Sequence, residues 1–253
     1  MTLDLGRYGT REILNLQVFD YVSKNPLMYF DYANTATFET GSTRVHAWGA
    51  GSRRLSWDGE KQLTLTVETQ IFSMEHLAML SGEEIISGAK DIYKVETVAV
   101  GAGGAIALKN SPIGGVDGVA VFPFIRGVID KQAPQPIESV TSNTVTLATG
   151  AAVAEGDEVQ VFYQFSSASA HTISFTAKGF PQYVKLVGDT LYMDEVAGTA
   201  VDAQMVFYKA KVQPNVTIGM SSQGDPTSIS LVFDLYPVQV NGTDTIADIT
   251  VFE

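Results

Sequence analysis

The chain has 253 residues, no cysteine, and a net charge of −12 from 16 Lys+Arg and 28 Asp+Glu. The lack of cysteine excludes disulfides, thiolate metal sites and a thiol nucleophile. The acidic balance argues against a protein that clamps nucleic acid, because such affinity comes from Lys and Arg, although it still allows a protein past which DNA slides without sticking. With 45% hydrophobic and 17% charged residues, the chain can bury a substantial core, as one large all-β unit or two small domains.

The first residues, MTLDLGRYGTREIL, lack the basic and long apolar segments of a signal peptide. No run approaches the roughly 20 apolar residues of a transmembrane helix. We therefore expect a soluble protein made in a cytoplasm, with no membrane insertion. Residues 1–20 carry apolar side chains without helical spacing, which indicates an extended arm followed by a strand.

Residues 26–70 show the alternation typical of strands. Asp58-Gly59 is the dipeptide most typical of a tight hairpin turn, so residues 51–70 are predicted to fold as a hairpin around it. Side chains alternate along a strand. The strand after this turn would therefore hold an apolar face of Leu63, Leu65 and Val67 and a polar face of Thr64, Thr66 and Glu68.

One helix is predicted, at about residues 73–81 in the stretch SMEHLAMLSGEEI. Ser73 can act as its N-cap and Gly82 can end it, or Ser81 and Glu84 can start a second short turn as a capping box. An apolar stripe indicates that the helix covers the end of a barrel or sheet. The stripe consists of Met74, Leu77, Ala78 and Leu80.

From residue 93 to residue 195 the pattern is strand after strand, with glycine turn signals at the spacing of an all-β protein. The proline-rich stretch QAPQPIES, residues 132–139, is the best candidate boundary of a subdomain. The predicted division is a β core of residues 1–92 and 195–253. Residues 93–194 would form a β-rich middle region, part of which would be an outward decoration.

The stretch KAKVQPNVTIGMSSQGDPTSISLVFDLYP, residues 209–237, is predicted to form a hairpin with its turn at residues 223–226. Both strands should have one apolar and one polar face. The apolar face would contain Val216, Ile218 and Met220 of the first strand and Ile229, Leu231, Phe233 and Leu235 of the second. The polar face of the second strand would contain Ser228, Ser230, Val232, Asp234 and Tyr236, a surface almost free of charge.

No constellation of catalytic residues is apparent. The three histidines, His46, His76 and His171, have no metal-ligand spacing, and we expect each on the surface. VGAGGAIAL lacks the third glycine of a dinucleotide-binding loop and is followed by a strand pattern, so a β-turn is the better interpretation. We predict no enzyme activity, no cofactor and no metal.

An all-β chain without catalytic residues usually acts through its surfaces. Sheets with one apolar and one low-charge face can close into a barrel, or copies can join edge to edge in a ring whose polar faces line a channel. A wall of Ser, Thr, Asn and Gly with a few carboxylates would not bind DNA, because carboxylates do not displace the counterions around the DNA phosphates.

Two segments carry a resemblance to a known family. They are YFDYANTATFETGSTRVHAWGAGSRRLSWDGEKQLTLTVETQIFSMEHLAMLSGEEI, residues 29–85, and KAKVQPNVTIGMSSQGDPTSISLVFDLYPV, residues 209–238. A glycine-punctuated strand pair, a polar strand ending in Glu-Thr-Gln and a short helix with Leu-x-x-Leu-Ser-Gly resemble bacteriophage tail tube proteins. The second segment is similar to the last core hairpin of that family.

The resemblance implies a β-barrel-like subunit with a flanking helix, assembled as hexameric rings that stack into a hollow tube. An early hairpin, here residues 40–69 with Arg53, Arg54 and Trp57, would stack the rings. The inner wall would be lined by Thr64, Thr66 and Glu68 and by Ser228, Ser230 and Asp234. The implied partners are further copies, a tape measure protein, a sheath in contractile tails, and baseplate or terminator proteins. DNA would be present only in transit, in a virion tail assembled in the host cytoplasm.

Two alternatives fit the same pattern. The inner tube of a bacterial contractile injection or secretion system shares the architecture but moves protein. A β-sandwich that binds carbohydrate would instead need exposed aromatic side chains, for which Trp48, Trp57 and Tyr163 are the candidates.

Overall fold

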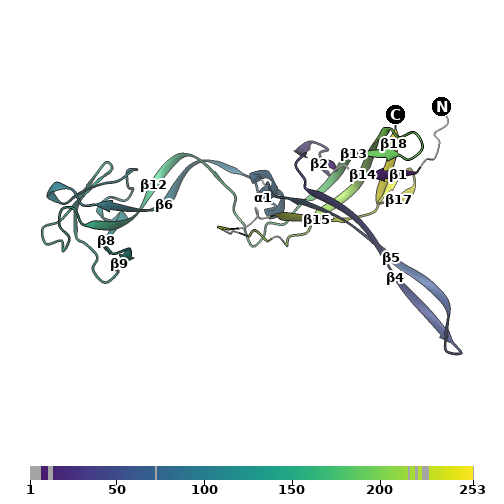
Figure 1. Cartoon of the computed structure of the whole chain (residues 1–253), viewed down its shortest axis with the longest axis horizontal. Helices are drawn as coiled ribbons and strands as arrows, with labels where there is room; N and C mark the ends of the chain where they lie inside the picture. The colour runs from purple at the N-terminus through teal and green to yellow at the C-terminus, as the bar shows by residue number, and fades with distance from the viewer. Residues whose placement is uncertain are drawn as a thin grey trace. The chain divides into compact units, whose positions relative to one another are not determined.

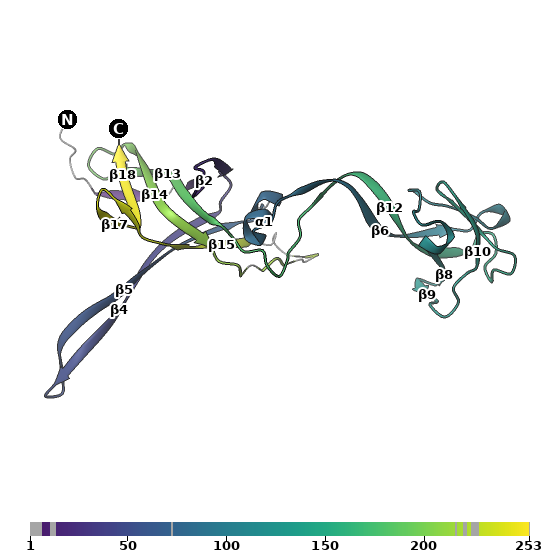
Figure 2. The same ribbon diagram turned by 180° about the vertical axis from the view of Figure 1, so that it is seen from behind.

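The computed structural model describes residues 7–10, 14–71, 73–215, 217–219, 222–223 and 228–252. Within these residues the chain is mostly β-strand, with one α-helix and two short 3-10 turns (Figures 1 and 2). The strand pairings in this part of the chain are antiparallel throughout. The predicted fold class, an all-β barrel or sandwich of antiparallel sheets with one short flanking helix, is confirmed.

The chain divides into two compact units. The larger unit contains residues 1–85 and 173–253, and the smaller unit contains residues 86–172. The sequence analysis placed the divisions at residues 92 and 195 instead. The segment 183–194 lies in the larger unit because its strand pairs with strands from both ends of the chain. Residues 132–139 lie within the smaller unit.

A nine-stranded sheet forms the larger unit. Its strands run in the order β3-β2-β13-β14-β15-β5-β4, with β1 paired to β13 and β18 paired to β14. These strands are β1 Tyr8–Thr10, β2 Asn15–Asp20, β3 Pro26–Phe30, β4 Thr35–Gly49, β5 Ser52–Thr69, β13 Tyr183–Asp194, β14 Ala200–Val212, β15 Ile229–Leu235 and β18 Ala247–Phe252. A separate pair, β16 Val238–Val240 and β17 Thr243–Thr245, precedes β18.

One face of this sheet is the core of the larger unit. Alternate residues of β5 and β15 are buried there, as the sequence predicts. The predicted set found buried in this cluster is Leu65, Val67, Ile229, Leu231, Phe233 and Leu235, with Leu63 packed at its edge. Full burial of each such side chain stabilises the fold by roughly 1.5–3 kcal/mol, so this face determines the register of the central strands.

The predicted hairpin of residues 209–237 is shorter than expected. β14 and β15 do pair, with Lys211 opposite Asp234, but β14 ends at Val212. Ile218, predicted to be in the core, lies outside any strand and is 36% exposed. Val216, Met220 and the turn residues 224–226 lie outside the described residues.

The helix α1 spans Met74–Ser81, as predicted from its caps. Ser73 is the N-cap, and Gly82 ends the helix in a left-handed conformation at φ 69°. A side chain at residue 82 would also collide with the backbone of Phe180, so only glycine fits there. Within the predicted stripe Leu80 is buried, and Met79, which we did not predict, packs on the core as well.

His76 corrects the prediction that all three histidines lie on the surface. It is 1% exposed and packs edge-on against the rings of Phe30 and Tyr32. Its Nδ1 accepts a hydrogen bond of 2.9 Å from the backbone N–H of Ser73, while the Ser73 hydroxyl accepts from the His76 N–H. Burial lowers the pKa of His76 below its usual range, because the charged ring would lose its hydration.

The smaller unit has its own core between two sheets. One sheet has the order β6-β12-β8-β9 and the other the order β10-β11-β7. The strands are β6 Ile86–Ala99, β7 Ala105–Ala107, β8 Val119–Ile125, β9 Val128–Ile129, β10 Ile137–Thr141, β11 Thr144–Leu147 and β12 Glu158–Thr172. The glycine stretch that resembles a phosphate loop is the 3-10 turn Ala102–Gly104 and leads into β7, so the β-turn interpretation is the correct one.

A buried carboxylate links the strands of the smaller unit. Glu96 on β6 accepts a hydrogen bond of 2.5 Å from the Tyr163 hydroxyl on β12, and both its oxygens accept from the Lys109 N–H. Burial and this bond to Glu96 raise the pKa of Tyr163. Tyr163 is buried, so it cannot serve as the exposed aromatic platform that a carbohydrate module would need.

Candidate functional site

A polar surface covers the face of the nine-stranded sheet that points away from the core. The register of β4, β5 and β15 aligns its side chains in three rows. These rows are Thr35, Glu68 and Ser230; Thr37, Thr66 and Val232; and Glu39, Thr64 and Asp234. The structure therefore brings together Thr64, Thr66, Glu68, Ser230 and Asp234, whereas Ser228 lies exposed just before β15. That these residues line a channel stays a prediction.

Hydrogen bonds across neighbouring strands hold the carboxylates of this polar surface. The Thr35 hydroxyl donates to Glu68 Oε2 at 3.2 Å, and Gln213 Nε2 donates to Asp234 Oδ1 at 2.8 Å. Such side-chain bonds limit the rotamers of the acidic groups without neutralising their charge.

Lysines stacked on tyrosine rings continue the surface beyond the predicted residues. The Lys209 ammonium lies 4.3 Å from the centre of the Tyr183 ring and the Lys211 ammonium 5.2 Å from it. The Tyr236 ring meets Tyr183 edge-on at 5.6 Å. Burial, followed by the nearby Asp234 carboxylate, raises the pKa of Tyr236. This face is therefore mixed in charge, with cations next to the carboxylates of β5 and β15.

The pairing of distant strands explains why sequence alternation alone missed this cluster. Tyr183 of β13 lies opposite Lys211 of β14, and Lys211 lies opposite Asp234 of β15. Alternation gives the faces of one strand but not which strands are neighbours. The only sequence signal was the run FYKAKV, residues 207–212, whose lysines alternate with apolar residues.

A second polar cluster lies on β2, β13 and β14. Both oxygens of the Asp189 carboxylate accept amide hydrogen bonds, one from Gln17 at 2.8 Å and the other from Gln204 at 2.9 Å. Across the described ranges, no three metal-ligating side chains gather as a cation site would require. The two amide donors hold the Asp189 carboxylate in one orientation on this surface.

β4 and β5 continue past the sheet as a two-stranded ribbon, residues 41–62, which we call the arm (Figure 1). The prediction of a turn at Asp58-Gly59 is wrong, because the chain reverses at Ala50-Gly51. Gly59 instead lies where the ladder is irregular opposite Thr43, and a Cβ there would lie 2.2 Å from the Thr43 hydroxyl oxygen. The Asp58-Gly59 dipeptide, which favours a tight turn, is also compatible with a β-bulge.

The two faces of the arm differ in chemistry. On one face Val45 pairs with Trp57 and Ala47 pairs with Leu55. The large side chains there are more than half exposed: Val45 64%, Leu55 61% and Trp57 55%. We call this set of four the apolar face of the arm.

The opposite face of the arm is polar and basic. There Arg44 forms an ion pair with Asp58, and the Arg53 guanidinium lies 5.4 Å from the Trp48 ring centre. The ion pair lowers the pKa of Asp58 and raises that of Arg44. Trp48 and Trp57 therefore point to opposite sides of the ribbon, and Arg54 lies near its end, with Nε 3.2 Å from the Gly49 carbonyl oxygen.

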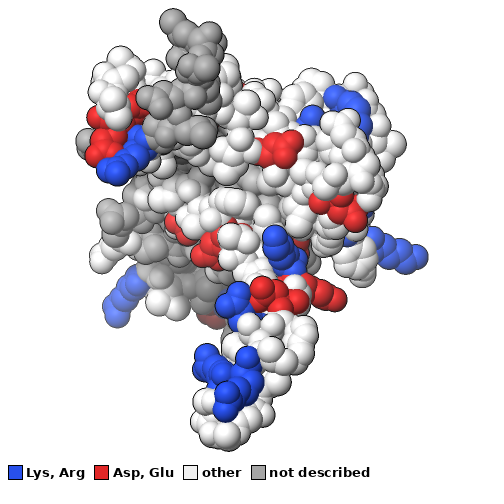
Figure 3. Space-filling model, turned by 90° about the vertical axis from the view of Figure 1, so that its right-hand side faces the viewer, with Lys and Arg blue, Asp and Glu red and all other residues white. Residues whose placement is uncertain are grey.

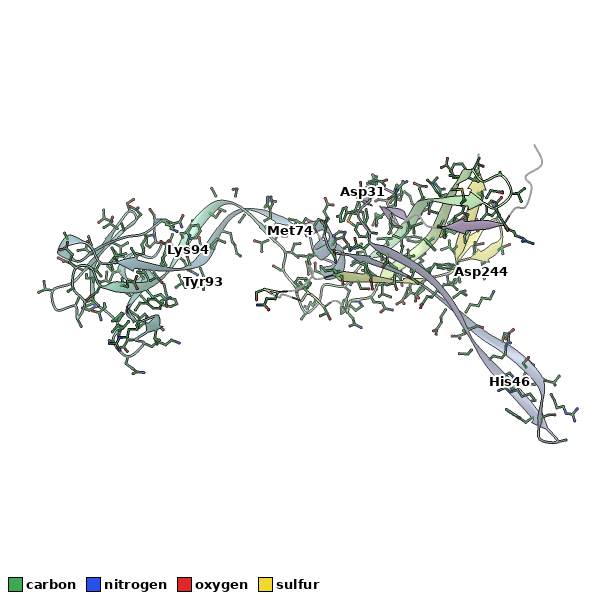
Figure 4. All side chains as sticks on the ribbon, viewed as in Figure 1. Asp31, His46, Met74, Tyr93, Lys94 and Asp244 are labelled. Atoms are coloured by element: carbon green, nitrogen blue, oxygen red, sulfur yellow. The ribbon has the colours of Figure 1, made fainter. Side chains whose placement is uncertain are left out.

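The arm is the basic part of an acidic chain. Its cationic side chains Arg44, Arg53, Arg54 and Lys61 outnumber Asp58 and Glu60, giving a charge of +2 against −12 for the whole chain. Figure 3 shows Lys and Arg gathered on the projecting end of β4 and β5. The predicted stacking residues Arg53, Arg54 and Trp57 all lie on this arm, whose distal half is marked by His46 in Figure 4.

The profile of the YomU/Tube protein family matches residues 9–250, which is nearly the whole chain. A search of the curated proteins finds no match. The match extends through the middle region, which lies outside the two segments that carry the resemblance. The expected relationship to phage tail tube proteins is thereby confirmed at the level of the family.

Proposed function

The chain belongs to the YomU/Tube protein family, and on that premise we propose that it is the structural subunit of a phage tail tube. Copies would join into hexameric rings, and the rings would stack around an acidic channel through which DNA passes. The observation that carries this proposal is the continuous polar face of the nine-stranded sheet, whose predicted lining residues share one register.

Closure of a ring would pair the open edges of the sheet with those of neighbouring subunits. β3 and β4 are its outer strands, and each can offer unpaired backbone groups along its free side. Exposed edges invite pairing with another chain. A ring in which each subunit's edge meets the next removes this liability and builds a closed wall from identical faces.

The polar face suits a wall that DNA must pass without binding. Glu39, Glu68 and Asp234 repel phosphates and release no counterions. The nearby Lys209 and Lys211 ammonium groups are stacked on the Tyr183 ring, which limits their reach. Small Ser and Thr side chains between them would keep the wall hydrated.

The arm would connect successive rings, with Arg53, Arg54 and Trp57 at the contact, and the smaller unit would decorate the outside of the tube. The partners of such a tube would be a tape measure protein in the lumen, baseplate or terminator proteins at the ends, and a sheath if the tail contracts. It would belong to the virion tail after assembly in the host cytoplasm. In the described part of the chain, no helix has the length and apolar character needed to cross a bilayer.

The two rival functions make different demands on the structure. A carbohydrate module needs clustered aromatic rings, but Tyr163 is buried and Trp48 and Trp57 point to opposite sides of the arm. The inner tube of a contractile injection system would use the same surfaces and differs in its protein cargo. Capsid and terminase genes beside the gene would favour the phage tail.

Electron microscopy of the purified full-length protein tests the proposal. We expect rings or tubes with a central hole as the concentration rises, and a cryo-EM map should place Thr66 and Ser230 on the inner wall. A protein that stays monomeric at every concentration would refute the tube, and a bore lined by residues 86–172 would refute the wall assignment.

A further inference from the structure

A groove in the larger unit lies between α1 and strands β2, β3 and β13. Its volume is about 450 Å³, within the range of pockets that hold a ligand or side-chain cluster. Its apolar lining comes from all four elements and is buried or half-buried, except that Leu27 is exposed. These side chains are Val18, Leu27, Met28, Ala78, Met79 and Val184.

Acidic side chains surround this apolar floor. Asp20, Glu75, Glu83 and Glu84 all line the groove, and no Lys or Arg is among the described residues that line it. Asp20 and Glu83 are held through one oxygen each: Asp20 Oδ1 accepts from the Ser23 N–H at 2.5 Å, and Glu83 Oε1 accepts from the Thr176 hydroxyl at 2.5 Å. The groove therefore fits an occupant that is apolar in the middle and cationic at its edges.

The arm has this complementary pattern. Its apolar face presents Leu55 and Trp57 to solvent, and Arg54 follows directly toward the tip, where the ladder is irregular, whereas Arg53 lies on the opposite face beside Trp48. Exposed Trp and Arg side chains of this kind are the residues most often found as energetic anchors of interfaces. The arm and the groove thus match in both polarity and charge.

The arm cannot fill the groove of its own chain. Residues 41–49 extend about 30 Å beyond the sheet at the rise of a strand. The free end of the arm lies away from α1 in both ribbon views, and Figure 4 labels Met74 at the start of α1 and His46 in the arm. An arm that occupies this groove therefore comes from a second copy of the chain.

We propose that the apolar face of the arm of one copy docks in the groove between α1 and β2, β3 and β13 of another copy. Leu55 and Trp57 would cover the apolar floor, and Arg54 beside them would meet the carboxylates of Glu75 and Glu84. This inference rests on the proposed function, because it names the receptor for the arm within the tube.

Site-directed cross-linking tests the contact directly, since the chain has no cysteine of its own. Full-length Leu55→Cys and Leu27→Cys proteins are mixed under assembly conditions and treated with a short bismaleimide. We expect a heterodimer band several-fold stronger than with Ser56→Cys in place of Leu55→Cys. Ser56 is also exposed but lies on the other face of the arm, so it is a matched control. Equal yields from the two positions would overturn the docking model.

Charge reversal provides a second test with an internal rescue. The arm variant Arg54→Glu, and the groove variant Glu75→Lys with Glu84→Lys, should each need about tenfold or more higher concentration to assemble, because like charges then face each other. An equimolar mixture should recover assembly, since each arm then finds a groove of opposite charge. Circular dichroism of each variant alone checks that it is folded.

The outcomes separate this inference from the proposed function. Tubes of the Leu27→Cys protein in which this cysteine stays fully reactive toward maleimide, or a mixture that fails to recover, would overturn the docking site and leave the tube in place. A wild-type chain that never associates would overturn both. Tubes, the Leu55-specific cross-link and recovery in the mixture together would support both.

Discussion

Lowering the pH below about 6.5 should destabilise the larger unit through His76. Its Nδ1 accepts from the backbone N–H of Ser73, so this nitrogen must be unprotonated in the folded state. A proton there would place two donors face to face, and it would also put a charge beside Phe30 and Tyr32 in a site that is 1% exposed. Both effects agree with the lowered pKa of the folded protein.

The direction of the pH effect on stability follows from the difference between the pKa of His76 in the unfolded chain and in the folded chain. The unfolded chain, with an ordinary histidine pKa near 6.5, binds the proton before the folded chain does. The stabilisation from a neutral His76 is therefore fully present above that pKa and is lost as the pH falls below it. One proton limits the loss to about 1.4 kcal/mol for each pH unit, down to the pKa of the folded state.

The assay is urea unfolding followed by circular dichroism between pH 7.5 and pH 5, with His76→Gln as the comparison. Glutamine does not titrate, and its side-chain oxygen can still accept from the Ser73 N–H. We expect His76→Gln to be the less stable protein at pH 7.5 and the difference to shrink as the pH falls. Parallel pH profiles for the two proteins would refute the reasoning, because His46 and His171 are present in both.

Three further changes test other parts of the molecule. Ser230→Lys should leave the fold intact and slow DNA ejection from assembled tails, whereas Ser169→Lys in the smaller unit should not; unchanged ejection kinetics would remove Ser230 from the wall. Glu96→Gln and Tyr163→Phe should each lower the free energy of unfolding by about 1–3 kcal/mol. A double-mutant cycle should give a coupling energy of about 0.5–3 kcal/mol between the two residues, and fully additive effects would contradict the hydrogen bond. Gly59→Val should disrupt the arm ladder and impair assembly while the urea midpoint of the sheet stays the same, and normal tubes from this variant would show that the bulge is dispensable.

Local patterns predicted the parts of the fold that depend on local chemistry. Strict alternation identified the buried residues of β5 and β15, because a slip by one residue would turn every side chain to the wrong face. Ser73 and Gly82 predicted the ends of α1 within one residue, since capping depends on a few neighbouring groups.

The errors arose where distant strands decide the outcome. Asp58-Gly59 suits a tight turn or a bulge equally, and only the pairing of β4 with β5 selects the bulge. The lysine and tyrosine cluster on the polar face depends on the pairing of β13, β14 and β15, which sequence alternation cannot show. His76 was assigned to the surface because a lone histidine usually is, but Phe30 and Tyr32 come from another part of the chain.

The construction of the arm links its stability to assembly. A two-stranded ribbon that leaves its sheet has only its own ladder and cross-strand pairs to stabilise it, which is marginal in water. Its polar pairs include an exposed Arg44–Asp58 ion pair and an exposed Arg53–Trp48 contact, and such surface interactions contribute little. The larger contribution available to the arm is burial of Val45, Leu55 and Trp57, and this burial requires a surface outside the arm. An interface that supplies this surface would therefore order the arm and join two copies in the same step, so a change such as Leu55→Ser should weaken association far more than it weakens the fold of the isolated subunit.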